Sequence, residues 1–207
     1  MPRGRLITIE GLDGAGKSTQ AAILADALSA RGLAVEVLRE PGGVAVSERV
    51  RELVMDPALS VSPRAETLLY AAARAQLVQE RLEPLLAQGT WVVLDRFVDS
   101  SLAYQGGGRG LGIEAVRAVN EFATGELVPD RTVLLAVDRG VGRARQASRG
   151  AEPDRLERED DAFFSAIEAA YASIAAAEPE RVRVVDAGGA SEAVAAGVLA
   201  AVEDVLP

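Results

Sequence analysis

Five short runs of the chain are rich in β-branched and other apolar residues. They are Leu6–Glu10, Ala34–Glu40, Trp91–Asp95, Thr132–Asp138 and Arg181–Ala187. The more continuous of these runs are typical of strands that are buried on both faces, as in a parallel sheet. The pattern therefore predicts five strands.

Segments with helical spacing of apolar residues lie between these runs. They are Ser18–Arg31, Ala65–Gln88, Gly112–Ala123, Asp160–Ala177 and Ser191–Leu206. Gly32 and Gly89 suit the ends of the first two helices, and Pro84 is expected to kink the second. Alternating strands and helices predict an open α/β sheet with right-handed crossovers and helices on both faces. No repeat or linker divides residues 1–207, so we expect a single domain.

The composition narrows the class of protein. Of the 207 residues, 49% are hydrophobic and 26% charged, which is typical of a globular chain. A formal charge of −9 argues against general binding to nucleic acid or a membrane surface. The chain has no cysteine and no histidine, which excludes disulfides, thiolate zinc sites, cysteine nucleophiles and histidine bases. Since we find neither a signal peptide nor an apolar run of about 20 residues, we expect a cytoplasmic protein.

The segment GLDGAGKS (Gly11–Ser18) fits the pattern G-x-x-x-x-G-K-[S/T]. In this pattern, backbone N–H groups surround a phosphate chain, and the N-terminus of the following helix adds positive charge. Lys17, the only lysine, can reach the outer phosphates, and the Ser18 hydroxyl can ligate Mg²⁺. A chance match is the alternative, but the segment follows a strand and opens a helix, as the motif requires. The expected ATP contacts are Gly11, Leu12, Asp13, Gly14, Ala15, Gly16, Lys17, Ser18 and Thr19.

Other residues indicate what kind of nucleotide protein this is. Without a second lysine, the chain lacks the N-K-x-D element with which small GTPases read guanine. Asp95, at the end of the third strand, can organise Mg²⁺ together with Ser18. The next residue is Arg96, where a hydrolytic ATPase commonly has a glutamate that positions water. Because an arginine suits a second phosphate, the Asp95–Arg96 pair favours phosphoryl transfer to an anionic acceptor over hydrolysis.

Several segments taken together closely resemble the bacterial thymidylate kinases, which phosphorylate dTMP to dTDP with ATP. They are Glu10–Gln20, Arg39–Gly43 (REPGG), Leu68–Gln76, Asp95–Arg109 and the pair Asp154–Arg155. The resemblance covers essentially the whole chain in the same order. It implies a P-loop NTPase-type three-layer fold with a five-stranded parallel sheet and a short lid at about residues 145–160. It also implies ATP with Mg²⁺, a role in dTTP synthesis, and a homodimer.

The resemblance implies roles for the residues that match the family's motifs. Asp13 would accept a hydrogen bond from the sugar 3′-hydroxyl of dTMP, near the transferred phosphate. Arg74 and Arg96 would hold the dTMP phosphate. Tyr70, one helical turn before Arg74 and so on the same face, would stack on thymine, where the family usually has phenylalanine. The remaining implied contacts are Ser101 and Gln105 to the base, Tyr104 to the sugar's 2′ position, and Glu40 and Pro41 at the pocket border.

The reaction that the resemblance implies needs a cation at the γ-phosphate more than it needs a base. The acceptor phosphate oxygen is already ionised near neutral pH, and transfer depends on alignment and positive charge. Some family members place an arginine beside the acidic residue of the glycine-rich turn, where this chain has Gly14. We therefore expect the lid to supply the cation from Arg149 and Arg155. Arg143 matches the position where similar enzymes stack an arginine on adenine.

Alternative interpretations remain open at this point. Each matching residue alone also fits a core or solvated role, and only the ordered set favours the kinase. The chain could phosphorylate another nucleoside monophosphate, or a deoxynucleoside with Glu40 as base. It could instead be an ATP-binding regulatory module without kinase activity, which would need no second phosphate site. A degenerate structural relative is disfavoured by the intact Lys17, Ser18, Asp95 and Arg96.

Overall fold

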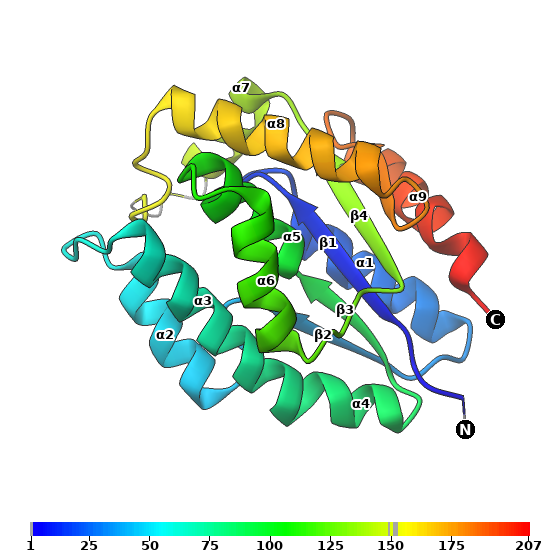
Figure 1. Cartoon of the computed structure of the whole chain (residues 1–207). Coiled ribbons are helices and arrows are strands. Elements are labelled where there is room, and N and C mark those ends of the chain that lie inside the picture. Colours follow the sequence, from blue (N-terminus) through cyan, green and yellow to red (C-terminus); the bar gives the residue numbers. More distant parts are fainter. Residues whose placement is uncertain (1, 149, 151–152) are drawn as a thin grey trace.

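The computed structural model describes residues 2–148, 150 and 153–207. Its centre is a parallel sheet with helices on both faces (Figure 1). The strands are β1 (Leu6–Gly11), β2 (Val35–Arg39), β3 (Trp91–Asp95), β4 (Arg131–Ala136) and β5 (Val182–Asp186). They pair in the order β2-β3-β1-β4-β5, and every pairing is parallel. The predicted five-stranded parallel α/β fold is confirmed, and every strand end lies within two residues of the prediction.

Helices connect these strands. They are α1 (Lys17–Ala30), α2 (Ala45–Met55), α3 (Pro63–Leu77), α4 (Glu83–Ala87), α5 (Val98–Ser101), α6 (Ile113–Thr124), α7 (Arg139–Ala147), α8 (Asp161–Ala177) and α9 (Ser191–Val202). Two π-helical turns, η1 (Val78–Leu82) and η2 (Leu102–Gly108), and a 3₁₀ turn, η3 (Glu203–Val205), complete the described elements. Within the described part of the chain, no helix is both long enough and apolar enough to cross a bilayer.

Several of these elements differ from the sequence prediction, which did not include α2, α5, η2 or α7. The long helix expected over 65–88 runs from α3 through η1 into α4, and it widens into the π turn just before Pro84. A proline lacks the N–H that would continue the helix, and its ring crowds the preceding turn, so the change in winding accommodates it. The sequence analysis did not predict α2, because only Ser47, Val50 and Val54 on this helix are buried.

The core lies on both faces of the sheet, and β1 is buried along its whole length. Side chains alternate between the two faces along a strand. Ile7 and Ile9 therefore pack in the cluster that contains α1 and α9. Leu6 packs on the other side, with Leu77 of α3 and Leu82 of η1. This sandwich fixes β1 at the centre and directs the loop that follows it to the middle of the sheet edge.

Three loops converge at the carboxyl edge of the sheet. Ile9 of β1 pairs with Asp95 of β3, and Asp95 pairs with Arg39 of β2. The loop after β1, the turn at Arg96 after β3 and the segment at Glu40 after β2 therefore begin side by side. In open parallel sheets, ligands bind at this edge.

Candidate active site

The loop between β1 and α1 has the geometry of a phosphate-binding turn. Gly14 and Gly16 have φ angles of 81° and 93°, which glycine adopts without the cost that a side chain would add. At Gly14, a Cβ atom would also lie 2.2 Å from the carbonyl oxygen of Gly142 on α7. The loop can approach α7 this closely only because residue 14 has no side chain. Any side chain at this position, an arginine included, would collide with that carbonyl group unless α7 moved.

Lys17 is the cation of this turn, and its side chain is only 7% exposed. Its Nζ donates a hydrogen bond to the carbonyl oxygen of Leu12 at 2.9 Å and lies 3.7 Å from Oδ1 of Asp13. Burial and the positive charge of Arg96 lower the pKa of Lys17 to about 8, although Asp13 opposes them. A buried ammonium in this setting is stabilised by a further negative charge, such as that of a phosphate.

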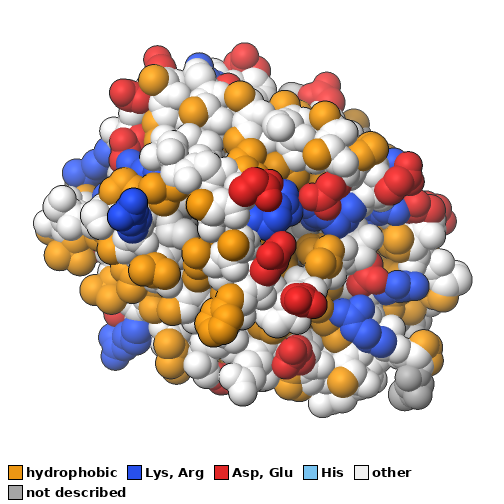
Figure 2. Space-filling view, viewed as in Figure 1, with side chains coloured by type: hydrophobic (Ala, Val, Ile, Leu, Met, Phe, Trp, Pro, Cys, Tyr) orange, Lys and Arg blue, Asp and Glu red, His pale blue; other side chains and the backbone are white. Residues whose placement is uncertain are grey.

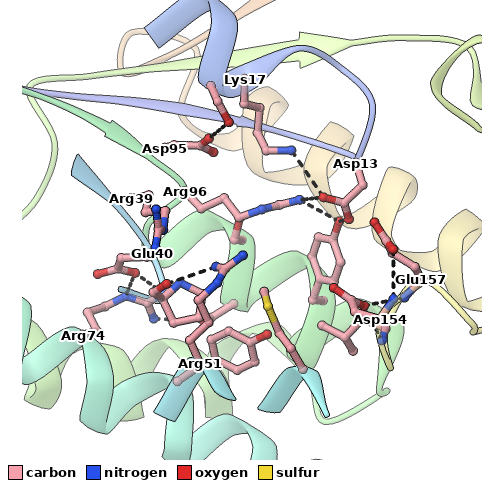
Figure 3. Close-up of a pocket in the computed structure, with 18 of the residues that line it drawn as sticks. Asp13, Lys17, Arg39, Glu40, Arg51, Arg74, Asp95, Arg96, Asp154 and Glu157 are labelled. Atoms are coloured by element: carbon pink, nitrogen blue, oxygen red, sulfur yellow. Dashed lines mark hydrogen bonds and ion pairs between the residues drawn. The ribbon is translucent and has the colours of Figure 1, made fainter. Parts of the chain in front are cut away.

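Arg96 connects the turn to the pocket beside it (Figure 3). Its Nη2 donates to Oδ1 of Asp13 at 2.6 Å, and its Nη1 donates to Oγ of Ser100 at 3.1 Å. Its guanidinium lies 5.1 Å from the ring centre of Tyr104, whose hydroxyl donates to Oδ2 of Asp13 at 3.1 Å. Burial alone would raise the pKa of Asp13, but the charges of Arg96 and Lys17 outweigh it and hold this pKa well below its usual range. Asp13 is therefore a permanent anion between two cations.

Ser18 and Asp95 provide a pair of oxygen ligands next to Lys17. Oγ of Ser18 donates to Oδ2 of Asp95 at 2.5 Å, because the start of α1 and the end of β3 meet at the sheet edge. Hard oxygen donors suit Mg²⁺, which usually takes one or two protein ligands together with phosphate oxygens and water. Among the described residues, no cluster of three or more His, Cys, Asp or Glu side chains could hold a metal by itself. The residues present therefore fit a magnesium ion that arrives with a nucleotide.

A pocket of about 230 Å³ opens beside these residues. It contains every residue that the sequence analysis assigned to dTMP, together with most of the predicted phosphate contacts. Those lining it are Asp13, Gly14, Gly16, Lys17, Ser18, Glu40, Pro41, Tyr70, Arg74, Asp95, Arg96, Ser101, Tyr104 and Gln105. Gly11, Leu12, Ala15 and Thr19 do not line it. The structure thus brings together residues that are far apart in the sequence.

Arg74 lies at the floor of this pocket, and its side chain is 2% exposed. Its Nε donates to Oε2 of Glu40 at 2.7 Å, and its Nη2 donates to the carbonyl oxygen of Phe97 at 3.0 Å. Its Nη1 donates to Oγ of Ser101 at 2.9 Å and to Oδ1 of Asn120. The sequence analysis expected Arg74 to hold the dTMP phosphate together with Arg96, whereas here protein groups engage every nitrogen of its guanidinium. Arg74 therefore orders the floor, and Oε1 of Glu40 remains buried there without a hydrogen-bond partner.

The sequence analysis assigned no role to several residues of the pocket wall. They are Arg39, Arg51, Met55, Ser100, Asp154, Leu156 and Glu157. Arg51 belongs to α2 and donates from Nη1 to the carbonyl oxygen of Pro41 at 3.1 Å. The buried Val50 and Val54, four residues apart, were the signal that could have revealed this helix and with it the cation at position 51.

Glu10 is a further residue that the sequence analysis did not assign. Its carboxylate is fully buried and accepts hydrogen bonds from the N–H of Phe97 at 2.7 Å, Oγ of Ser100 at 2.5 Å and the hydroxyl of Tyr171 at 2.9 Å. Burial, together with the nearby Asp99, raises the pKa of Glu10 to about 7. These bonds hold the turn in which Arg96 has a φ of 68°, a conformation unusual for a residue with a side chain. A glutamate inside an otherwise apolar strand was the available signal.

Two further residues of the predicted site, Arg143 and Arg155, belong to the described residues after β4. Arg143 on α7 is exposed and pairs with Asp161 at the start of α8, and it lines a small hollow beside Leu12 and Asp13. Arg155 does not line the pocket. Its Nε donates to the carbonyl oxygen of Val54 at 2.9 Å, and its Nη2 lies 2.7 Å from Oε2 of Glu66.

The guanidinium of Arg155 therefore contacts Val54 on α2 and Glu66 on α3, and it does not contact the glycine-rich turn. The other predicted lid cation, Arg149, lies outside the described residues. The transfer role expected for the lid arginines therefore has no geometric support in the described part of the chain.

Comparisons with known proteins agree with one another. A family model described as thymidylate kinase matches residues 9–198. The chain is 48% identical to the thymidylate kinase of Deinococcus radiodurans over 204 residues, which are 99% of this chain and 98% of that protein. It is 46% identical to the thymidylate kinase of Alkalilimnicola ehrlichii over 207 residues, which are 100% of this chain and 94% of that protein. The crystal structure of thymidylate kinase from Ehrlichia chaffeensis matches with a TM-score of 0.79 at 29% identity and covers 98% of this chain and 99% of its own.

Proposed function

The chain belongs to the thymidylate kinase family and is a kinase that phosphorylates dTMP to dTDP; we propose that this transfer takes place in the pocket of Figure 3. The observation that carries the proposal is the arrangement of charge. Lys17 lies in the glycine-rich turn, Arg96 reaches in from the turn after β3, and Asp13 lies between them. Two cations that share one carboxylate oxygen, each able to bind a phosphate, suit transfer between two phosphates.

On the donor side, the proposed ATP site is the turn after β1 and the first residues of α1. Backbone N–H groups of the turn and the ammonium of Lys17 would bind the outer phosphates. Ser18 and Asp95 would hold Mg²⁺, which when bound would neutralise charge on the phosphates. Arg143, beside the small hollow at Leu12, is the proposed contact to adenine.

On the acceptor side, Arg96 is the proposed ligand of the dTMP phosphate. Its guanidinium contacts Asp13 and the carbonyl oxygen of Gly11 in the glycine-rich turn, where the donor phosphates would lie. Asp13 would accept a hydrogen bond from the 3′-hydroxyl. Arg51, which also lines the pocket, would add a second positive charge. Tyr104 would lie against the 2′ position of the sugar and so disfavour ribose.

The far end of the pocket is the proposed site for thymine. Tyr70 would stack on the ring, and Ser101 and Gln105 would make hydrogen bonds to its polar edge. Arg74 would contribute here, next to the base, by holding Ser101 and the pocket-border residue Glu40 in place. The cis-linked Pro41 would border the same pocket.

The proposed mechanism is direct transfer, in which an ionised oxygen of the acceptor phosphate attacks the γ-phosphorus of ATP, the bond from this phosphorus to the β–γ bridging oxygen breaks, and ADP leaves. Alignment and positive charge around the moving group supply the catalysis, and no general base is required. Lys17 and Arg96 flank the reacting groups. The lid residues Arg149 and Arg155 are proposed to supply the remaining cation, which for Arg155 would mean exchanging Glu66 for a phosphate.

We also propose that the protein acts as a homodimer in the cytoplasm. Leu53 on α2, Leu68 on α3 and Phe122 on α6 are 48%, 60% and 93% exposed, and α3 packs against both other helices. Figure 2 shows hydrophobic side chains gathered over these helices on the left of this face. A two-fold contact between such apolar faces would cover them.

Phosphorylation rates with dTMP, dUMP, dGMP, AMP and thymidine test the proposal. We expect the highest kcat/KM with dTMP, and titration calorimetry should show that dTMP binds without ATP. Tight ATP binding with no binding of dTMP at millimolar concentration would instead indicate an ATP-binding regulatory module.

A further inference from the structure

Glu66 is a completely buried carboxylate that does not line the pocket. It lies in the first turn of α3, one helical turn before Tyr70. Its Oε1 accepts a hydrogen bond from Nε2 of Gln105 at 2.8 Å and another from Nε of Arg109 at 3.2 Å. Its Oε2 accepts from Nη2 of Arg109 at 3.0 Å and lies 2.7 Å from Nη2 of Arg155. One side chain therefore joins α3, η2 and the segment before α8.

These neighbours determine which way the amide of Gln105 points. Arg109 donates to both oxygens of the Glu66 carboxylate, and a carboxylate offers only acceptors. The NH₂ group of Gln105 must therefore face Glu66, because the amide oxygen would meet a carboxylate oxygen and be repelled. An amide without such a neighbour could turn over and exchange its donor and acceptor ends.

With its NH₂ group on Glu66, the Gln105 amide has its carbonyl oxygen left for another partner. The side chain lines the pocket, and no donor from the described residues forms a hydrogen bond with this oxygen. The pocket wall at Gln105 is therefore a hydrogen-bond acceptor. The main-chain carbonyl oxygen of Gln105, which is distinct from the side-chain oxygen, accepts a hydrogen bond from the backbone N–H of Leu111 at 3.3 Å. This bond helps to hold the residue in place.

An acceptor at this place distinguishes between pyrimidines. Thymine and uracil carry an N–H at ring position 3, whereas cytosine has a bare nitrogen there, which is itself an acceptor. An acceptor facing an acceptor leaves both unpaired, and a buried unpaired polar group is costly. We propose that Glu66 is a positioning residue that holds the Gln105 carbonyl toward the acceptor base and so makes the pocket select bases with an N3–H over cytosine. This inference rests on the proposed function of the pocket.

The test is the ratio of kcat/KM for dTMP to kcat/KM for dCMP in the full-length enzyme. Glu66→Gln offers Gln105 an amide that can donate as well as accept, so the Gln105 side chain is free to turn over. We expect this ratio to fall about tenfold or more, an effect of the size of one lost hydrogen bond. The matched control is Glu159→Gln, because Glu159 also pairs with Arg109, at 2.6 Å, but does not contact Gln105. This control should keep the wild-type ratio.

Two further variants separate positioning from a structural role. Gln105→Met should lower the ratio as Glu66→Gln does, and adding Glu66→Gln to Gln105→Met should change the ratio no further. If Glu66→Gln does not fold, Glu66→Asp takes its place, because it keeps the charge that faces the two arginines but withdraws the carboxylate from Gln105.

Two results would overturn the inference. One is a folded Glu66 variant with an unchanged ratio, even if its stability or KM changes, because a structural defect would affect both nucleotides alike. The other is Gln105→Met with the wild-type ratio. If the wild-type enzyme itself fails to phosphorylate dTMP, the proposed function fails, and not this inference alone.

Discussion

Arg96 and Asp13 form an ion pair across the pocket, with Nη2 of Arg96 2.6 Å from Oδ1 of Asp13. The pair links the turn after β3 to the loop after β1, although the two residues are 83 positions apart in the chain. Nζ of Lys17 lies 3.7 Å from the same carboxylate oxygen. One anion therefore keeps two cations close together before any phosphate binds. When phosphates bind, we expect their negative charges to share with Asp13 the stabilisation of these two cations.

Removing the guanidinium of Arg96 should affect the acceptor far more than the donor. We expect Arg96→Ala to lower kcat/KM for dTMP by roughly 10²–10³-fold, because the transition state loses a charged partner in a pocket shielded from water. KM for ATP should change little. Steady-state kinetics with each substrate varied in turn measures both effects. Arg31→Ala, which removes only an exposed ion pair with Glu203, is the control. A rise in KM for ATP as large as that in KM for dTMP would argue against an acceptor-side role.

The lowered pKa of Lys17 gives two pH effects of opposite sign. Because this pKa is about 8 in the folded chain, below its usual 10.5, the ammonium is lost as the pH rises above 8. ATP binding should therefore weaken above this pH. Between pH 8 and 10.5 the unfolded chain binds more protons at this residue, so the contribution of Lys17 to folding stability should rise over the same range.

Calorimetric titration with ATP and denaturant unfolding, both from pH 6.5 to 10, measure these two effects. Lys17→Met should remove both pH dependences, since it leaves nothing to titrate at this position. ATP affinity that stays constant up to pH 10 in the wild type would contradict the assignment.

Glu10 should matter for stability and for dTMP binding together. Glu10→Ala leaves the N–H of Phe97 and the hydroxyls of Ser100 and Tyr171 without their buried acceptor, and we expect the free energy of unfolding to fall by about 2–4 kcal/mol. KM for dTMP should rise, since the turn that carries Arg96 loses its anchor. Denaturant unfolding and steady-state kinetics measure the two quantities. Thr8→Val, a buried change two residues away on β1, should lower stability without changing this KM.

The lid proposal makes a kinetic prediction. At least one of Arg149→Ala and Arg155→Ala should lower the single-turnover transfer rate, and arginines that act in this way elsewhere contribute on the order of 10³–10⁵-fold. Rapid-quench measurement with saturating ATP and dTMP isolates this step from product release. Arg183→Ala, near the far end of β5, is the control. Transfer rates near the wild-type value for both lid variants would show that the lid assignment is wrong.

The proposed dimer face can be tested by adding a charge to it. Leu68→Asp places a carboxylate on the exposed face of α3, where a partner would bury it, so we expect a shift from dimer to monomer. Sedimentation velocity measures the change. Val184→Asp, an exposed change on β5 at the opposite end of the sheet, should leave the oligomeric state unchanged. A wild-type protein that sediments as a monomer would contradict the proposal directly.

The strands and the phosphate-binding turn could be predicted from sequence because local rules determine them. Trp91–Asp95 is an apolar run with a polar end, and the structure gives β3 these same bounds. Gly14 and Gly16 occupy positions where φ is positive, and this requirement is visible in the residue types themselves. The family motifs then supplied the acceptor residues, all of which line the pocket.

Other features depend on partners that are distant in sequence and could not be predicted. Arg74 forms hydrogen bonds with Glu40 and Asn120, which are distant in sequence and are brought to it only by the fold. The sequence therefore did not predict that protein groups would occupy its guanidinium. Likewise, no local pattern indicates that Arg155 would face Glu66, 89 positions earlier in the chain. Glu10 and Arg51 were missed because each acts through neighbours supplied by other elements.

A crystal structure of the protein with dTMP and an unreactive ATP analogue tests the central claim most directly. The account predicts that both nucleotides are bound, with the outer phosphates of the analogue at Lys17 and the dTMP phosphate at Arg96, facing each other for in-line transfer. Phosphate at only one of these places, or an Arg96 guanidinium turned away from the dTMP phosphorus, would contradict it.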